Sequence, residues 1–279
     1  MKSKITAILS VILILALIFS TGCSKQDGGT DENTTQATAA QGTADGDSAT
    51  AAPVNGENPT TPDGQEDTST TGAETTSTPS TPAEIVALFN ESANKIKTDA
   101  TKVVKNYEKR KLNEEHFVVP ESLETTGRNM ISSFMKDDNE LITYSTKEDI
   151  RNEYIVPGQS YVSRLDTTYV TSATCTDKGS TYEIVIRLKD QRNPTAGVGI
   201  GAVCDVIETG EVADKAPFVN EFSTSYYSCE IRATIDKATG KMTHANYKTP
   251  LVLELNVSLF GTHDIEVGFT FEKDYTITY

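Results

Sequence analysis

The sequence predicts an α+β domain, in which a long N-terminal helix and one or two shorter helices pack on a curved antiparallel β-meander of about five strands. Apolar residues recur at helical spacing directly after residue 82, and the spacing changes to alternation after Ser160. Tight-turn residues separate the alternating segments. Helices followed by a run of strands are the order typical of α+β domains.

An export signal precedes this domain. The chain begins with the basic Met1-Lys2-Ser3-Lys4, continues with an apolar run over 5–19 and reaches Ser20-Thr21-Gly22-Cys23. A basic start, an apolar core of about 7–15 residues and a small-residue cleavage site define such signals. A transmembrane helix needs about 20 apolar residues, more than this run contains. We therefore predict a signal peptide over 1–22.

The end of this segment resembles the bacterial lipobox, although Ser20 stands where that motif usually has Leu. The resemblance covers residues 1–23 and implies that the Cys23 thiol is acylated and becomes the first residue of the mature chain. The implied location is the extracytoplasmic face of the cell membrane, with the membrane as partner. Two or more acyl chains hold a protein stably in a bilayer.

Residues 23–82 form a tether rich in Ser, Thr, Gly and Asp. Val54 is its only aliphatic residue larger than Ala, and it contains no aromatic residue. Such a segment buries too little apolar surface to offset its conformational entropy, so we predict disorder. A glycosylated stalk is the alternative, suggested by Thr-Ser-Thr-Thr at 68–71.

The folded domain is predicted to span 83–279 and to begin with a capped helix. Thr81 is placed at the N-cap, Pro82 at the first helical position and Glu84 at the third, which is the capping-box pattern. The apolar stripe that follows predicts a helix over 82–110 and consists of Ile85, Phe89, Ala93, Ile96, Ala100, Val103, Val104 and Tyr107. The lysines on its other faces form a solvated surface or meet an anionic partner.

Two shorter helices are predicted next. Pro120 precedes a candidate helix over 121–136, whose buried side would contain Leu123, Met130, Ile131, Phe134 and Met135. A second capping-box pattern at 145–148 predicts a short helix that ends before Pro157.

Alternating residues then predict strands with one buried face. They occupy 169–175, 182–188, 229–235, 242–247, 251–259 and 265–271, followed by Tyr275, Ile277 and Tyr279. Turn signals lie at 177–180, 236–241 and 261–264. Half-polar strands joined by tight turns indicate an antiparallel sheet, and the long helix is the expected cover of its apolar face.

The segment 193–218 departs from this alternation. Gly197, Gly199 and Gly201 alternate with apolar residues, and an acidic stretch follows. We expect either a flexible lid over one end of the sheet or a short helix with a glycine-rich entry. A dinucleotide-binding fingerprint is rejected because it requires a parallel βαβ unit.

No catalytic or metal-binding constellation is predicted, and we expect neither a cofactor nor enzymatic activity. His116, His244 and His263 lack ligand spacing. Asp137-Asp138 is interpreted as a turn at a helix end, since the six to eight oxygens that calcium takes are not evident nearby.

Three cysteines remain after Cys23. Cys175 and Cys229 fall on predicted strands and could be neighbours, and an exported protein can form disulfides. With Cys204 the number is odd, so at least one thiol stays unpaired. The alternative is that all three are reduced, small, buried residues. No activating base for a catalytic thiol is identifiable.

The net charge and the aromatic content of the chain disfavour two classes of function. The net charge of −15 disfavours nucleic-acid binding, and the absence of tryptophan weighs against a polysaccharide platform. Tyr226-Tyr227 is the only adjacent aromatic pair; we expect one ring to pack on the sheet and the other to face outwards. The chemistry excluded so far leaves a cell-surface lipoprotein with a non-enzymatic binding domain.

The predicted layout is loosely similar to the half-barrel lipoproteins of the LolA and LppX type, which implies a lipid or another apolar ligand. That ligand requires an apolar cavity of more than about 300 Å³ between helix 83–110 and the sheet. The alternative is a structural or accessory envelope lipoprotein that acts through protein–protein contacts, with an exposed apolar patch.

Overall fold

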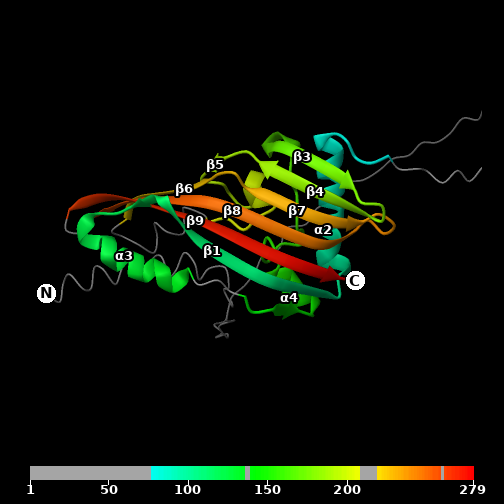
Figure 1. Ribbon diagram of the computed structural model, residues 1–279, viewed down its shortest axis with the longest axis horizontal. Coiled ribbons are helices and arrows are strands. Elements are labelled where there is room, and N and C mark those ends of the chain that lie inside the picture. The colour runs from blue at the N-terminus through cyan, green and yellow to red at the C-terminus, as the bar shows by residue number, and fades with distance from the viewer. Residues whose placement is uncertain (1–76, 136–138, 208–218, 259–260) are drawn as a thin grey trace, which may run out of the picture. The chain divides into compact units, whose positions relative to one another are not determined.

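The computed structural model of the chain describes residues 77–135, 139–207, 219–258 and 261–279. These residues form one antiparallel sheet of nine strands, with three α-helices (Figure 1). The strand order is β2-β1-β9-β8-β7-β4-β3, with β6 and β5 beside the far half of β8. The α+β mixture is therefore confirmed, but the sheet is larger than the five strands predicted.

The bounds of the elements are as follows. The α-helices are α2 (Pro82–Asp99), α3 (Glu121–Phe134) and α4 (Lys147–Glu153), and the 3-10 helices are η2 (Thr167–Tyr169) and η3 (Gly199–Ala202). The strands are β1 (Lys102–Val118), β2 (Ile142–Tyr144), β3 (Val170–Asp177), β4 (Thr181–Leu188), β5 (Gln191–Arg192), β6 (Val219–Tyr226), β7 (Glu230–Asp236), β8 (Lys241–Ser258) and β9 (Thr262–Thr278).

Three long strands form the centre of the sheet. β9 pairs with β8 from Thr276 opposite His244 to Thr262 opposite Ser258, and with β1 along its other edge. The shorter strands are added beside these three, so the sheet has a broad half and a narrow half. The hairpin between β8 and β9 ends the narrow half (Figure 1).

Pro250 lies where β8 changes its neighbour. β7 pairs with β8 up to Lys248, and β6 pairs with it from Leu251 onward. A proline cannot donate to a sheet ladder, so the point between two neighbouring strands is where it is tolerated. The sequence pattern broke at this proline and predicted two strands, whereas the structure has one.

The predicted N-terminus of the first helix is confirmed. The Thr81 side chain accepts a hydrogen bond from the backbone of Glu84, whose carboxylate accepts one from the backbone of Thr81. Phe89, Ala93 and Ile96 are fully buried on the inner side of α2, which packs against β3, β4 and β8.

The predicted C-terminal end of this helix is wrong. α2 ends at Asp99, and residues 102–118 form β1 instead of continuing to residue 110. Ala100, Val103 and Tyr107 match helical spacing, whereas the structure buries Val103 and Lys105 at the spacing of a strand. The short segment therefore did not distinguish the two periods. Pairing along β9 satisfies the backbone of β1, and this tertiary interaction overrides the helical pattern.

The predicted cavity required a helix over 83–110, and α2 ends at Asp99. No described helix covers the sheet beyond Asp99 in the way that a helix over 83–110 would. Side chains of α2 such as Phe89 and Ile96 occupy the layer between helix and sheet. An apolar ligand stays a prediction, without the site that was expected for it.

The other predicted elements are largely confirmed. α3 begins after Pro120 as expected and ends slightly early, with Ile131 buried. The N-cap of α4 is Thr146 rather than Ser145, because its side chain accepts from the backbone of Asp149. β1, β2, β5 and β6 were missed, and Asp137-Asp138 lies outside the described residues.

The glycine-rich segment packs into the core as a short helix. η3 follows Gly197, and Ile200, Val203 and Cys204 are buried. A Cβ atom on Gly201 would lie 2.1 Å from the carbonyl oxygen of Thr195, so this backbone approach requires glycine. The short-helix alternative is thus confirmed for 199–202, and the acidic residues 208–218 lie outside the described part.

Within the described ranges, no helix has both the length and the apolar character needed to cross a membrane. The predicted export signal over 1–22 lies outside those ranges.

The capping box provides a test of the first helix. Thr81→Ala removes the acceptor for the backbone of Glu84, and we expect the free energy of unfolding to fall by about 1 kcal/mol. Chemical denaturation measures this value. Thr98→Ala, at an exposed position near the end of the same helix, is the matched control and should change stability by less than half as much; equal losses would contradict the role of the cap.

Candidate functional site

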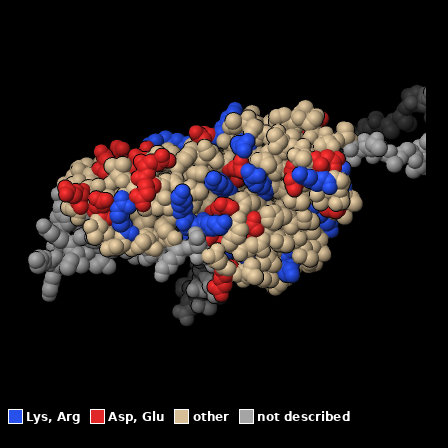
Figure 2. All heavy atoms as spheres, viewed as in Figure 1, with Lys and Arg blue, Asp and Glu red and all other residues tan. Residues whose placement is uncertain are grey.

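The face of the sheet opposite α2 carries polar side chains from five strands. Figures 1 and 2 look onto this face, and the helix α2 lies behind it. Its side chains come from alternate positions of β1, β9, β8, β7 and β4. We call it the open face, because no described helix packs on its centre in this view.

A row of alternating charges crosses the open face. The registers place Lys109 of β1 opposite Glu272, Glu272 opposite Lys248, Lys248 opposite Glu230 and Glu230 opposite Arg187. The guanidinium of Arg187 lies 2.9 Å from the carboxylate of Glu230, and that of Arg232 lies 2.6 Å from it. Opposite charges on neighbouring strands stabilise a sheet, so this row both fixes the register and presents charge in a defined order.

Space-filling atoms show the same alternation. In Figure 2, basic and acidic side chains intersperse across the middle of the face, whereas acidic side chains gather toward the hairpin end. Glu254, Asp264 and Glu266 belong to that end of β8 and β9. The face therefore has a mixed centre and an acidic end.

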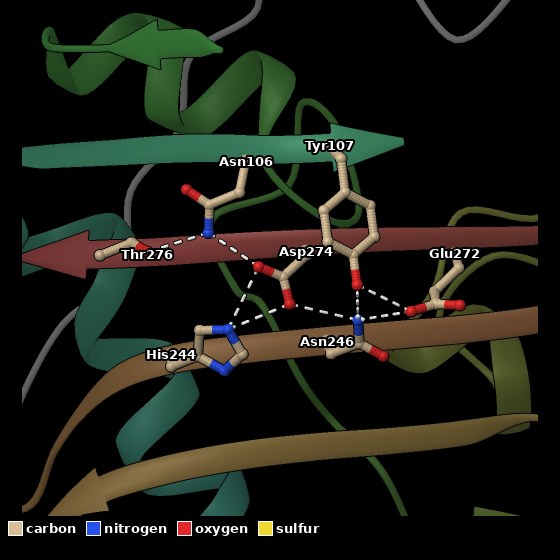
Figure 3. Close-up of polar contacts among 7 residues, drawn as sticks. All are labelled: Asn106, Tyr107, His244, Asn246, Glu272, Asp274 and Thr276. Atoms are coloured by element: carbon tan, nitrogen blue, oxygen red, sulfur yellow. Dashed lines mark hydrogen bonds and ion pairs between the residues drawn. The ribbon is translucent and has the colours of Figure 1, made fainter. Parts of the chain in front are cut away.

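Beside the charged row lies a network of seven polar residues (Figure 3). Tyr107 donates from its hydroxyl to Glu272 Oε1 at 2.8 Å, and Asn106 donates to Asp274 Oδ1 at 2.7 Å and to Thr276 Oγ1 at 2.9 Å. Side chains of β1 thus donate hydrogen bonds to the carboxylates of the neighbouring strand β9.

Two residues of β8 complete the network. The amide nitrogen of Asn246 lies 3.2 Å from each of three acceptors, the Tyr107 hydroxyl, Glu272 Oε1 and Asp274 Oδ2. Because an amide group has only two hydrogens, it shares them among these acceptors. His244 Nε2 lies 3.0 Å from Asp274 Oδ2. Three strands are cross-linked by these side chains.

The surroundings of the Tyr107 hydroxyl keep this group protonated. Burial of the hydroxyl raises the pKa of Tyr107 to about 12, and its hydrogen bond to Glu272 and the charge of Asp274 act in the same direction. The ammonium of Lys109 also lies 4.4 Å from the centre of its ring. Tyr107 therefore acts in the network as a hydrogen-bonding group rather than as a proton-transfer group near neutral pH.

A second charged cluster lies on the inner face of the sheet. The carboxylate of Glu108 lies 3.1 Å from the ammonium of Lys105 and 3.0 Å from the guanidinium of Arg110. Burial alone would raise the pKa of Glu108, but Lys273, Arg110 and Lys105 outweigh it and lower the pKa to about 2. Glu108 thus stays ionised and holds the cations at the inner face.

The structure places the three histidines apart. His244 joins the network, as expected for a strand residue, and His263 lies just after the hairpin. His116 Nδ1 contacts Glu266 Oε1, and its ring packs 5.7 Å from that of Tyr227. Tyr226 is buried and Tyr227 is half-exposed, which confirms the expectation for this pair. Within the described ranges, no three His, Cys, Asp or Glu side chains are grouped as a metal would require.

The cysteines do not form the pair that was considered. β4 lies between β3 and β7, so Cys175 and Cys229 are not neighbours. All three thiols are free, and Cys204 and Cys229 are buried. Burial raises the pKa of Cys204 to about 12 and also raises that of Cys229. Neither has the depressed pKa of a reactive thiol. Cys23 lies outside the described residues.

Most of the network was not predicted from the sequence. Tyr107 was assigned to the buried stripe of a helix, and Asn246, Glu272 and Asp274 were given no role. Opposite charges at outward positions of successive strands were the available signal, since such pairs meet across a sheet.

Comparisons with known proteins give no relative. No family model matches the chain, and neither a curated protein nor a solved structure is significantly similar to it.

The cluster around Glu108 predicts that the free energy of unfolding falls in acid. Since the pKa of Glu108 is lowered from 4.5 to about 2, its stabilising effect is complete above pH 4.5 and disappears as the pH falls toward 2. Glu108→Gln should therefore lower the free energy of unfolding by about 3 kcal/mol near neutral pH, a difference that shrinks in acid.

Denaturant titrations of both proteins between pH 7 and pH 2 measure this difference. Glu183→Gln changes a carboxylate with about half of its side chain exposed and serves as the control. A difference between wild type and Glu108→Gln that stays constant over this pH range would rule out the ionised cluster.

Proposed function

We propose that this protein is a lipid-anchored cell-surface protein whose folded domain is a non-enzymatic binding module. Cys23 carries the anchor, the tether predicted over 23–82 separates the domain from the membrane, and the open face makes the contact with an extracytoplasmic partner. The observation that carries the proposal is the ordered polar surface built by Tyr107, Asn246, Glu272 and Asp274.

The chemistry of this surface favours a polar partner. Its donors and acceptors are held by one another, so little side-chain entropy is lost when a partner binds. The alternating row from Lys109 to Arg187 offers both signs of charge, which suits a protein surface with a complementary charge pattern. The accessory lipoprotein considered as the alternative would use the same protein–protein contact.

The anchor has a direct test. Cys23→Ser replaces the sulfur that acylation requires, and we expect the full chain to move from the membrane fraction to the soluble extracytoplasmic fraction. Fractionation of host cells followed by immunoblotting measures the distribution. Cys175→Ser, in the folded domain, is the matched control and should stay with the membrane; membrane retention of the Cys23 variant would refute the anchor.

The contact surface is tested by site-specific photo-crosslinking in the host. A photoreactive residue in place of Lys248, exposed at the centre of the open face, should form one discrete adduct. The same residue in place of Glu148 on α4 should form none.

A charge reversal identifies the contact as specific. Arg232→Glu should reduce the adduct from position 248 several-fold, because it disrupts the charge pattern next to that position. Arg151→Glu, the same change on exposed α4, should leave it unchanged. Equal adducts from both faces, or insensitivity to Arg232→Glu, would overturn the open face as the binding surface.

A further inference from the structure

We propose that β3 is a self-association edge, through which two copies of this chain pair antiparallel and join their sheets into one. The pairing itself does not depend on the open face. Its strengthening by the membrane, argued below, rests on the lipid anchor proposed above.

β3 is the last strand at one side of the sheet. It pairs with β4 along one edge from Val170 to Asp177, and no other described strand pairs with its second edge. Thr171, Thr174 and Thr176 are exposed. Half of the backbone amides and carbonyls of an edge strand point away from the sheet, so β3 offers a template for a further strand.

The opposite side of the sheet is protected against such pairing. β2 has only three residues, and it covers β1 only at 103–105. The rest of β1 contains register shifts after Lys105 and after Asn113, and its charged residues include Lys109, Lys111, Glu114 and Glu115. Short strands, irregularities and charges are the usual protections of sheet edges.

β3 has fewer of these protections. Residues 171–176 read Thr-Ser-Ala-Thr-Cys-Thr, without charge or proline. One register shift lies at the start of the strand, between Val170 and Ser172, and the register with β4 is regular from there to Asp177. Residues 171–176 of β3 carry no charge, whereas the outer strand β1 at the opposite side carries several. This contrast indicates that the edge is used rather than exposed to solvent.

The absence of charge favours a second copy as the occupant. In a two-fold antiparallel pair, one residue lies opposite its own equivalent and its neighbours pair symmetrically. A charged edge would then face its own charge, which destabilises a ladder, whereas the threonines of β3 pair well with each other. A two-fold contact of this kind also closes at the dimer and does not extend into a fibre.

The anchor adds to this interaction. The described part of the domain begins beside the end of β3, where the hydroxyl of Thr78 donates to the carboxylate of Asp177 at 3.2 Å. Copies held in one membrane have a raised effective concentration, so a short edge contact can form there although it is small in area.

Opposite charges at one position test the pairing. Thr174→Lys and Thr174→Glu change an exposed side chain on the open-face side of β3, and each variant alone should repel its own copy. Two differently tagged copies of the full chain, solubilised from host membranes in mild detergent, should co-purify several-fold less for either variant than for wild type.

Co-expression of the Lys variant with the Glu variant should restore co-purification, which shows that both variants fold. Thr143→Lys, on exposed β2 at the opposite edge, is the matched control and should behave as wild type. Undiminished co-purification of the single variants, or no recovery in the mixture, would overturn the proposal. The fractionation of Cys23→Ser tests the lipid anchor separately. A failure of the anchor hypothesis is therefore distinguished from a failure of the pairing of β3.

Disulfide trapping identifies the partner. Thr174→Cys combined with Cys175→Ser should give an intermolecular disulfide dimer in oxidised host membranes, and Thr143→Cys in the same background should not. A dimer of twice the mass of the chain supports self-association. No cross-link, or a cross-link only to a different protein, would refute a second copy as the occupant.

Discussion

The hydrogen-bonded ladder that holds β9 between β1 and β8 is the constraint on which the rest of the structure depends. β9 is paired along both edges, and its alternate side chains point to opposite faces. Ile265, Val267 and Phe269 are buried on one side, while Glu272 and Asp274 belong to the polar network. A slip of one residue would exchange the two sets, so the core and the open face depend on the same register.

This register also places two groups of charged residues, the cluster around Glu108 on the inner face and the charged row on the open face. The two groups differ in their effect on stability. On the inner face, three cations outweigh the burial of Glu108 and lower its pKa, so that an ion cluster is tolerated inside the fold. On the open face, Glu230 and its arginines are partly exposed and contribute less to stability. The inner cluster thus stabilises the fold more than the outer row does.

The sequence predicted those elements whose signals are local. The capping box located the start of α2, and alternation located β3, β4 and β7. β1 was misread because Val103 and Tyr107 fit a helical period. In the structure a register shift between Lys105 and Tyr107 puts Val103 and Tyr107 on opposite faces of the sheet, and only the pairing with β9 fixes this arrangement. β6 was missed because Val219–Tyr226 contains few apolar residues at alternate positions. The polar network combines residues that lie more than a hundred positions apart, which no local pattern reports.

The position of Pro250 has a mechanical consequence. The turn that joins β3 to β4, beside Thr78, and the hairpin that joins β8 to β9 lie at opposite ends of the sheet (Figure 1). Beyond Pro250, β6 takes the place of β7 beside β8, so a pull between Thr78 and the hairpin passes through β6, β8, β9 and β1. Such a force runs along these strands, and their interstrand hydrogen bonds share it simultaneously instead of opening one by one. The domain is therefore built to resist traction along its long axis.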